Sequence, residues 1–151
     1  ECFVEDTLAI LKEYDFPPSQ LWIEITERCR DLPISMIKKT VTAFREAGIH
    51  ITMDDYGTGS SSSQMMLELP VEGVKIDMFF VKDILEEKKK QALVIGMINF
   101  ANAADLKICI EGIENDNLES YLRQFDVTWF QGYHYSRSIC QDELMKLLIK
   151  P

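Results

Sequence analysis

The chain has 151 residues, of which 46% are hydrophobic, and this is enough apolar material for one domain with a buried core. Its formal net charge of −9 argues against a surface for nucleic-acid polymers, although bound metal ions would still let it accept a small phosphorylated ligand. The four cysteines have no CxxC spacing, so a zinc or disulfide framework is not expected and a reducing cytoplasm fits best. No apolar run approaches the ~18 residues of a membrane span.

Helix-like and strand-like segments alternate along the whole chain. Helices are predicted at 3–14, from Pro33 onward, at about 61–69, after Asp77, at 117–125 and at 141–149. Apolar runs that read as strands lie between them, at 21–27, 50–55, 73–77, 107–111 and 127–131. This alternation predicts parallel strands joined by right-handed crossovers, and the continuous apolar runs suit strands that are covered on both faces. No linker is visible, so residues 1–151 are predicted to form a single domain.

The apolar spacing also predicts which helix faces are buried. The first helix should bury Phe3, Leu8, Ile10 and Leu11. The helix after Pro33 should bury Ile34, Ile37, Val41 and Phe44, with Gly48 at its C-terminal cap. The helix after Asp77 should be broken near the charged run at 86–90, and its second half should bury Leu93, Met97, Phe100 and Ala104.

Polar side chains recur where the predicted strands end. They are Glu24, Glu27, Asp54, Asp55, Lys75, Asp77, Glu111, Glu114 and Gln131. In a parallel βα architecture the C-terminal ends of all strands lie on one face, so these side chains should converge. Carboxylates gathered in one place repel each other unless a cation sits between them, and divalent metal ions with oxygen ligands are the expected occupants.

The acidic residues differ in how strongly they indicate a site. Glu24 and Glu27 are three apart, so Glu24 should point into the site while Glu27 lies in the following loop; both could instead be surface acids that open the next helix. Asp54 and Asp55 precede a turn with Gly57 and Gly59, and adjacent acids there can contact two ions. A plain turn rich in Asp and Gly is the alternative.

The remaining polar residues have both functional and structural interpretations. Lys75 lies in a run that should be buried, where it could hold a water or stabilise charge on a phosphate; the alternative is an ion pair with Asp54, Asp55 or Asp77. Glu111 or Glu114 could be a metal ligand or a base, and the Gln131 amide could orient a ligand. His50 and His134 are isolated from any sequence partner and read as structural, and the scattered aromatic residues read as core.

Five motifs in order resemble those of the EAL domain family: Glu-Ile-Thr-Glu at 24–27, Asp-Asp-Tyr-Gly-Thr-Gly at 54–59, Val-Lys-Ile-Asp at 74–77, Glu-Gly-Ile-Glu at 111–114 and Gln-Gly-Tyr at 131–133. The resemblance covers nearly the whole chain. It implies a modified TIM barrel and a phosphodiesterase that opens cyclic di-GMP to linear pGpG with Mg2+ or Mn2+. A more distant alternative is another Mg-dependent barrel enzyme, such as an enolase-like lyase, but this does not account for the motif order.

The resemblance also implies roles for single residues. Glu24 and Asp54 are similar to ligands of a first metal, and Asp54 would bridge to a second metal held also by Asp55 and Glu111. Lys75 resembles the lysine that positions the hydrolytic water, so the catalytic set is Lys75, Asp55 and Glu111. The supporting or substrate-contacting positions are Glu27, Glu114, Gln131, Gly57 and Gly59.

The chain also departs from the family pattern. The Glu-Ala-Leu motif of the first strand and an asparagine on the next strand, both metal ligands in the family, are not found. Ser60-Ser61-Ser62 and Ser136-Arg137-Ser138 replace the usual residues after the glycine turn and near the end. At 151 residues the chain is shorter than the ~250 of a whole barrel, so we expect a partial TIM-like barrel without its first strands.

This expectation has consequences for activity and assembly. Hydrolysis by the chain should be poor, and a catalytically silent receptor for cyclic di-GMP, or a protein-interaction module, is the alternative function. The open barrel should have unpaired edges and an apolar inner face, which predicts a homo-dimer. An upstream regulatory or GGDEF domain is possible in a parent protein, which could be membrane-anchored.

Overall fold

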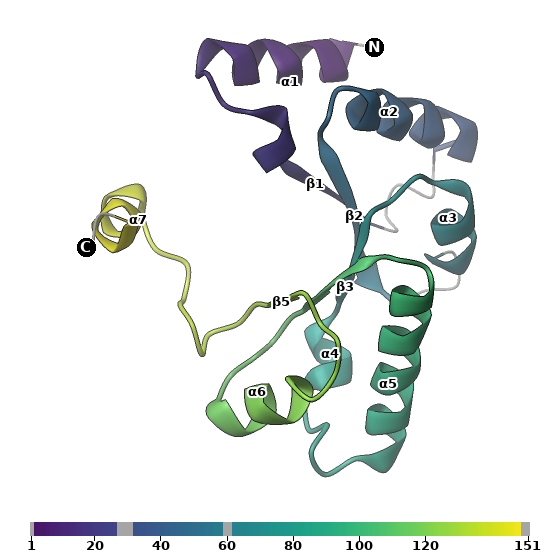
Figure 1. Cartoon of the computed structure of the whole chain (residues 1–151), viewed down its shortest axis with the longest axis vertical. Coiled ribbons are helices and arrows are strands. Elements are labelled where there is room, and N and C mark those ends of the chain that lie inside the picture. The colour runs from purple at the N-terminus through teal and green to yellow at the C-terminus, as the bar shows by residue number, and fades with distance from the viewer. Residues whose placement is uncertain (1, 27–31, 59–61, 149–151) are drawn as a thin grey trace.

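The computed structural model describes residues 2–26, 32–58 and 62–148 (Figure 1). The first half contains α1 (Cys2–Glu13), a short 3-10 turn η1 (Pro18–Gln20), β1 (Trp22–Ile25), α2 (Ile34–Glu46), β2 (His50–Tyr56), α3 (Ser62–Glu68) and β3 (Gly73–Ile76). The second half contains α4 (Met78–Val81), α5 (Lys88–Ala103), β4 (Lys107–Ile110), α6 (Asp116–Leu122), β5 (Trp129–Phe130) and α7 (Gln141–Leu148). No helix in these ranges is long and apolar enough to cross a membrane.

The five strands form one parallel sheet in the order β1-β2-β3-β4-β5, so each strand pairs with the next strand along the chain. In a flat sheet, spacings of about 4.8 Å per strand would hold β1 and β5 nearly 20 Å apart. Instead the rings of Trp22 on β1 and Trp129 on β5 meet edge to face, with centroids 5.2 Å apart. The sheet is therefore strongly curled, and the predicted partial TIM-like barrel is confirmed.

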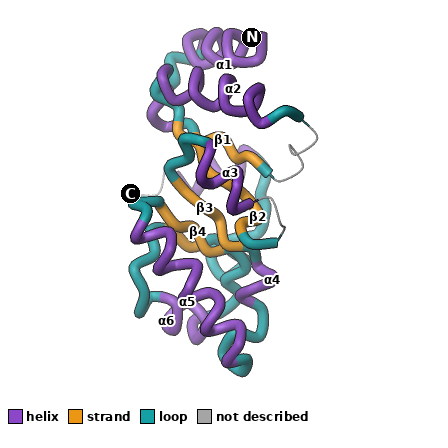
Figure 2. The backbone as a smooth tube through the Cα atoms, turned by 90° about the vertical axis from the view of Figure 1, so that its right-hand side faces the viewer, coloured by secondary structure: helices purple, strands orange, loops and turns teal. Residues whose placement is uncertain are grey.

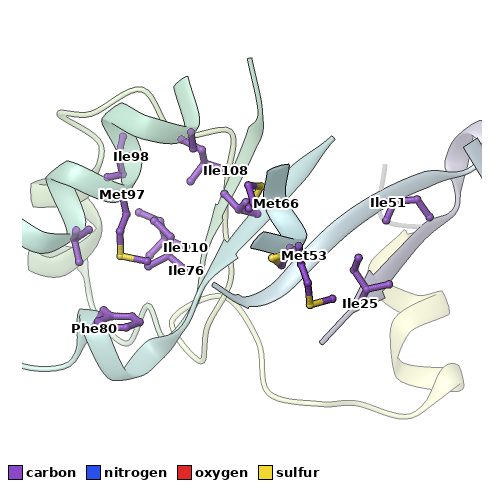
Figure 3. Packing of buried hydrophobic residues seen from close by; sticks show 14 of the residues in the cluster. Ile25, Ile51, Met53, Met66, Ile76, Phe80, Met97, Ile98, Ile108 and Ile110 are labelled. Atoms are coloured by element: carbon purple, nitrogen blue, oxygen red, sulfur yellow. The ribbon is translucent and has the colours of Figure 1, made fainter. Parts of the chain in front are cut away.

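The hydrophobic core lies between the outer face of the curled sheet and its helices. Buried side chains alternate along the strands, as Ile51 and Met53 do on β2 and Ile108 and Ile110 do on β4. Figure 3 shows them packed with side chains of the surrounding helices, including Met66 on α3 and Ile98 on α5. Helix α1 lies over α2 at one end of the molecule (Figure 2), where Phe3 contacts the buried ring of Phe44.

Helix α2 shows how the local sequence sets an element. It begins after Pro33 and buries Ile37, Val41 and Phe44 as the spacing predicts, while Ile34 is only partly buried. Its end has a Schellman arrangement, in which the backbone N–H of Gly48 donates to the Arg45 carbonyl and that of Ile49 donates to the Phe44 carbonyl, both at 3.0 Å. Gly48 adopts a φ of +85°, and this confirms its predicted place at the cap.

Two predicted helix faces are wrong in part. On α5 the buried residues are Val94, Met97, Ile98 and Ala101, whereas Leu93 is 49% exposed and Phe100 is 43% exposed. Ala104 is also exposed and lies just beyond the helix. The segment 92–101 is apolar almost all the way round, so spacing alone could not fix its rotation. On α1, Leu11 is buried, but Phe3 and Ile10 are mostly exposed.

The inner face of the sheet also differs from the prediction. Helices α2 and α5 contact strands of the sheet and enclose the apolar core on its outer face, whereas the inner face lines an open cavity. That inner face is only partly apolar: charged and polar side chains lie on it beside the apolar residues Trp22, Val74, Trp129 and Phe130. Along each strand, residues on the inner face alternate with core residues, so a segment that looks apolar in the sequence can still place polar side chains on one face.

Candidate functional site

Lys75 lies at the centre of the predicted site. Its ammonium donates to Glu111 Oε1 at 2.6 Å and to Glu24 Oε1 at 2.9 Å, and it lies 3.5 Å from Asp54 Oδ1. These four residues come from, or directly follow, the strands β1, β2, β3 and β4. The structure thus brings together Glu24, Asp54, Lys75 and Glu111 as the strand-end pattern predicts.

The carboxylates account for how a lysine can lie inside the sheet. Lys75 is buried between the core residues Val74 and Ile76 on β3. Burial lowers its pKa, but hydrogen bonds from the ammonium to Glu111 and Glu24, with the added negative charge of Asp54, outweigh this and hold the pKa above its ordinary value. Lys75 therefore stays cationic at neutral pH.

Asp77 does not join this ion pair, although it was one of the expected partners of Lys75. Its Oδ1 accepts a hydrogen bond of 2.7 Å from the backbone N–H of Phe79 and caps the N-terminus of α4. The aspartate two residues beyond Lys75 thus has a local structural role in the turn from strand to helix.

The Asp54-Asp55 pair lies in an irregular stretch of β2. The register with β3 shifts between Met53 and Tyr56, and Asp55 has a φ of +55°. The Asp55 carbonyl accepts hydrogen bonds from the backbone N–H and the hydroxyl of Thr58, at 3.1 and 2.9 Å. In a regular strand two adjacent side chains point to opposite faces, and this irregularity interrupts the alternation at the acid pair.

Gly57 makes the turn after this pair possible. It adopts a φ of +93°, and a Cβ atom there would lie 2.7 Å from Cε of Met97. A larger residue would have to displace the core side chain of α5 as well as adopt a strained backbone. Two more of the predicted supporting positions, Glu27 and Gly59, lie outside the described residues.

The ends of β4 and β5 hold the remaining predicted residues. The backbone N–H of Gln131 donates to the Ile110 carbonyl at 2.9 Å, and the Gln131 carbonyl accepts from Ile113 at 3.1 Å, so Gln131 is fixed beside Glu111. Glu114 is exposed and lines a neighbouring hollow of about 190 Å3 together with Glu111 and Gln131. Glu114 therefore lies next to the site without a contact to Lys75 among the described ion pairs.

A cavity of about 480 Å3 opens on the inner face of the sheet. The residues that line it are Trp22, Glu24, Thr52, Val74, Lys75, Cys109, Trp129, Phe130 and Gln131. Sequence reasoning missed Trp22, Thr52, Cys109 and Trp129 as lining residues. The period of two along each strand could have found them, because Trp22 and Trp129 lie two residues before Glu24 and Gln131.

Cys109 is half-buried beside Lys75 in the strand register, not a fully enclosed small hydrophobe. Burial, which the charge of Lys75 only partly offsets, raises the pKa of its thiol to about 11, and the carboxylates Glu111, Glu24 and Asp54 add to the increase. At neutral pH the side chain is therefore a neutral thiol.

The carboxylates fit a metal site by their chemistry. Oxygen atoms of Glu24, Asp54 and Glu111 lie within 3.5 Å of one common cation, the Lys75 ammonium. Hard carboxylate oxygens of this kind are the ligands that Mg2+ and Mn2+ prefer. The donor set is therefore suited to a small divalent cation.

Both histidines have acidic partners, so the expectation that they are isolated is wrong. His50 Nδ1 lies 2.5 Å from Glu72 Oε2, and Glu72 also pairs with Arg45. His134 Nε2 lies 3.0 Å from Glu119 Oε2 and 3.5 Å from Asp116 Oδ1. Asp116, Glu119 and His134 could hold a metal ion by distance, but Arg123 already neutralises Glu119.

Comparisons with known proteins agree with this geometry. The family model "EAL domain" matches residues 1–138. The chain is 36% identical over 137 residues to the probable cyclic di-GMP phosphodiesterase PdeB of Escherichia coli, which is 91% of this chain and 26% of that protein. It is 30% identical over 147 residues to the signaling protein YkoW of Bacillus subtilis, which is 97% of this chain and 18% of that protein.

Solved structures show the same likeness. The EAL domain of Mycobacterium smegmatis DcpA superposes with a TM-score of 0.92 at 30% identity, covering 98% of this chain and 66% of that one. A complex of the PaMucR phosphodiesterase with c-di-GMP superposes with a TM-score of 0.84 at 26% identity, covering 93% and 57%. The chain thus spans about a fifth to a quarter of the curated relatives and up to two thirds of these solved structures.

Proposed function

Because the chain belongs to the EAL domain family, we propose that it carries most of the active site of a metal-dependent phosphodiesterase that hydrolyses cyclic di-GMP to linear pGpG. The observation that supports this is the Lys75 ammonium among three carboxylates at the C-terminal ends of parallel strands. In βα barrels this end of the strands is where active sites lie. Relatives named as cyclic di-GMP phosphodiesterases make this substrate the natural choice.

We assign the metal ligands by combining the motif with the geometry. Glu24 and Asp54 would hold a first Mg2+ or Mn2+, and Asp54, Asp55 and Glu111 would hold a second. When bound, such ions polarise the phosphate and lower the pKa of a coordinated water.

The other residues would act around the ions. Lys75 would donate to the attacking water or to a phosphate oxygen, since its ammonium is already fixed at this edge of the sheet. The Gln131 amide would orient the ligand, while Glu114 and Glu27 would support the site. Gly57, which adopts a positive φ, would let the loop after Asp55 turn sharply. Gly59 would serve the same turn as a supporting residue.

A receptor without catalytic activity is the second candidate function. The first-strand Glu-Ala-Leu motif decides between the two, because it supplies a first-metal ligand in the family: a parent protein without that glutamate favours the receptor. A domain that binds cyclic di-GMP without cleaving it, or one that acts through a protein partner, needs only part of the metal site.

A comparison of the hydrolysis rates of the chain alone and of a completed barrel distinguishes an enzyme from a receptor. With Mn2+, residues 1–151 should convert cyclic di-GMP to pGpG very poorly, because an incompletely coordinated ion is loosely held and badly oriented. Placing the first strands of the Mycobacterium smegmatis DcpA EAL domain before residue 1 should raise the rate by at least about a hundredfold. Chromatography of the nucleotide products measures both rates. A folded chimera that binds cyclic di-GMP but leaves it intact would support the receptor instead.

We also propose a cytoplasmic setting and, in a parent protein, an upstream regulatory or GGDEF domain. The matched regions are 26% of PdeB and 18% of YkoW, so most of each of these relatives lies outside the match, which leaves room for such domains. A cytoplasmic setting fits a thiol such as Cys109 with no disulfide partner among the described cysteines.

We expect the chain to form a homo-dimer or a larger assembly. In the described ranges β1 pairs only with β2, and β5 pairs only with β4, so each has a free backbone edge. Helix α7 also leaves Leu144, Met145 and Leu148 exposed. Light scattering at low micromolar concentration measures the mass. A stable monomer would show that the edges are protected within one chain.

A further inference from the structure

We propose that Lys75 is a resident counter-cation of the acidic site: it holds Glu24, Asp54 and Glu111 together when no metal is bound, and it competes with divalent metals for their oxygens. The competition rests on the proposed function, because it takes these carboxylates as metal ligands. The holding role rests only on the contacts in the structure. The two parts are therefore tested separately.

The contacts show that the three carboxylates depend on one cation. One carboxylate oxygen of each acid lies close to the Lys75 ammonium, at 2.6 Å for Glu111, 2.9 Å for Glu24 and 3.5 Å for Asp54. Over residues 2–26, 32–58 and 62–148, the ion pairs of these three acids are with Lys75 alone. Carboxylates gathered around one ammonium repel one another, and more strongly when they are partly buried; Asp54 and Glu111 are each only 19% exposed. Without Lys75 the site would hold three unbalanced negative charges.

The anchoring of Lys75 makes it a permanent occupant. Its backbone is in the middle of β3, which pairs with β2 on one side and β4 on the other. The side chain is 9% exposed, and the flanking residues Val74 and Ile76 are in the core. The strand therefore anchors the side chain on the wall of the cavity, so the ammonium stays within reach of the carboxylates whether or not a metal is bound.

A fixed ammonium must oppose metal binding. The oxygens of Glu24 and Glu111 that accept hydrogen bonds from Lys75 are less available as metal ligands. A divalent ion placed between the same carboxylates is also repelled by the positive charge of Lys75. Metal affinity is then set below the value that the carboxylates alone would give. A lysine that helped to bind the metal would instead raise the metal affinity of the site, and a lysine that only supported the fold would leave that affinity unchanged.

The holding role is tested by a double-mutant cycle in metal-free buffer with EDTA at neutral pH. In the native chain, Glu24→Gln should lower the denaturation midpoint because it removes a partner of Lys75. In a Lys75→Met background the same Glu24→Gln should raise the midpoint, because it removes an unbalanced charge. Lys107→Met, a substitution of an exposed lysine on β4, is the matched control and should leave the effect of Glu24→Gln unchanged.

Loss of stability in both backgrounds would overturn the holding role. If Lys75→Met alone does not fold, the variant that also carries Glu24→Gln and Glu111→Gln should fold, since its size is nearly conserved and only Asp54 keeps a negative charge. Failure of that variant would make Lys75 a packing residue, and would equally contradict the proposal.

The competition is tested by Mn2+ titration with calorimetry, which requires no hydrolysis and so is independent of whether the protein is an enzyme. Lys75→Met should bind Mn2+ at least about tenfold more tightly than the native chain. Lys107→Met should match the native affinity. Unchanged, weaker or undetectable Mn2+ binding by Lys75→Met would refute the competition, whereas a loss of activity alone would bear only on the proposed function.

Discussion

Replacing Asp54 with asparagine is expected to lower the rate of cyclic di-GMP hydrolysis by the completed barrel at least about a thousandfold. Asp54 lies in the irregular stretch of β2, only 19% exposed and 3.5 Å from the Lys75 ammonium. In the proposed site it serves both metals, so the neutral amide removes negative charge from two ions at once. The shape of the side chain is nearly unchanged, so the folded structure should persist.

Asp77→Asn is the matched control for this prediction. It makes the same chemical change at another strand end, but Asp77 caps α4, and asparagine caps a helix about as well as aspartate does. Its hydrolysis rate should therefore equal that of the parent. The assignment of Asp54 as a bridging ligand would fail if Asp54→Asn kept more than about a tenth of the parent rate while binding Mn2+ normally.

Replacing Gly132 with alanine should have the largest effect on stability. A Cβ atom at Gly132 would lie 2.1 Å from the Ile113 carbonyl oxygen and 2.4 Å from the Ile113 nitrogen. These are backbone atoms held by hydrogen bonds, because the Ile113 N–H donates to Gln131 and the Ile113 carbonyl accepts from His134. Neither the backbone at Ile113 nor the backbone at Gly132 can move without breaking the hydrogen bonds that join the ends of β4 and β5. The free energy of unfolding should therefore fall by about 3 kcal/mol or more.

Urea denaturation measures this loss, and Gly96→Ala provides the control. Gly96 lies on the exposed side of α5, and a Cβ atom there would meet no atom within 4 Å. Alanine is the better helix residue, so that variant should gain about 0.5–1 kcal/mol. A Gly132→Ala protein as stable as the parent would mean that the close passage of the two backbone segments is not tight in solution.

The sequence predicted the parallel strands and the convergence of the site because both follow from local patterns. Five apolar runs alternate with helices, and parallel strands must place their C-terminal residues at one edge. This is why Glu24, Asp54, Lys75 and Glu111, which are far apart in the chain, could be expected in one place. The ion pairs of Lys75 in the structure agree with that expectation.

The features that the sequence did not predict depend on contacts between residues far apart in the chain, or on how a helix is rotated about its own axis. The partner of His50 is Glu72, which lies 22 positions further on, and nothing local links the two. The buried side of α5 depends on its rotation, which an apolar segment leaves undetermined. The irregularity at Asp55 depends on a positive φ that aspartate adopts only when the surrounding structure holds it there.

The contact between Trp22 and Trp129 gives the protein an optical signal of its own. These are the only two tryptophans in the sequence, and both line the same cavity, with ring centroids 5.2 Å apart. The His50 ring also stacks on Trp22 at 4.6 Å. Indoles this close couple their electronic transitions, so the tryptophan bands of the near-ultraviolet circular dichroism and the tryptophan emission both report on the curled interior. Any ligand, metal or added strand that widens or closes the sheet can therefore be followed without a label.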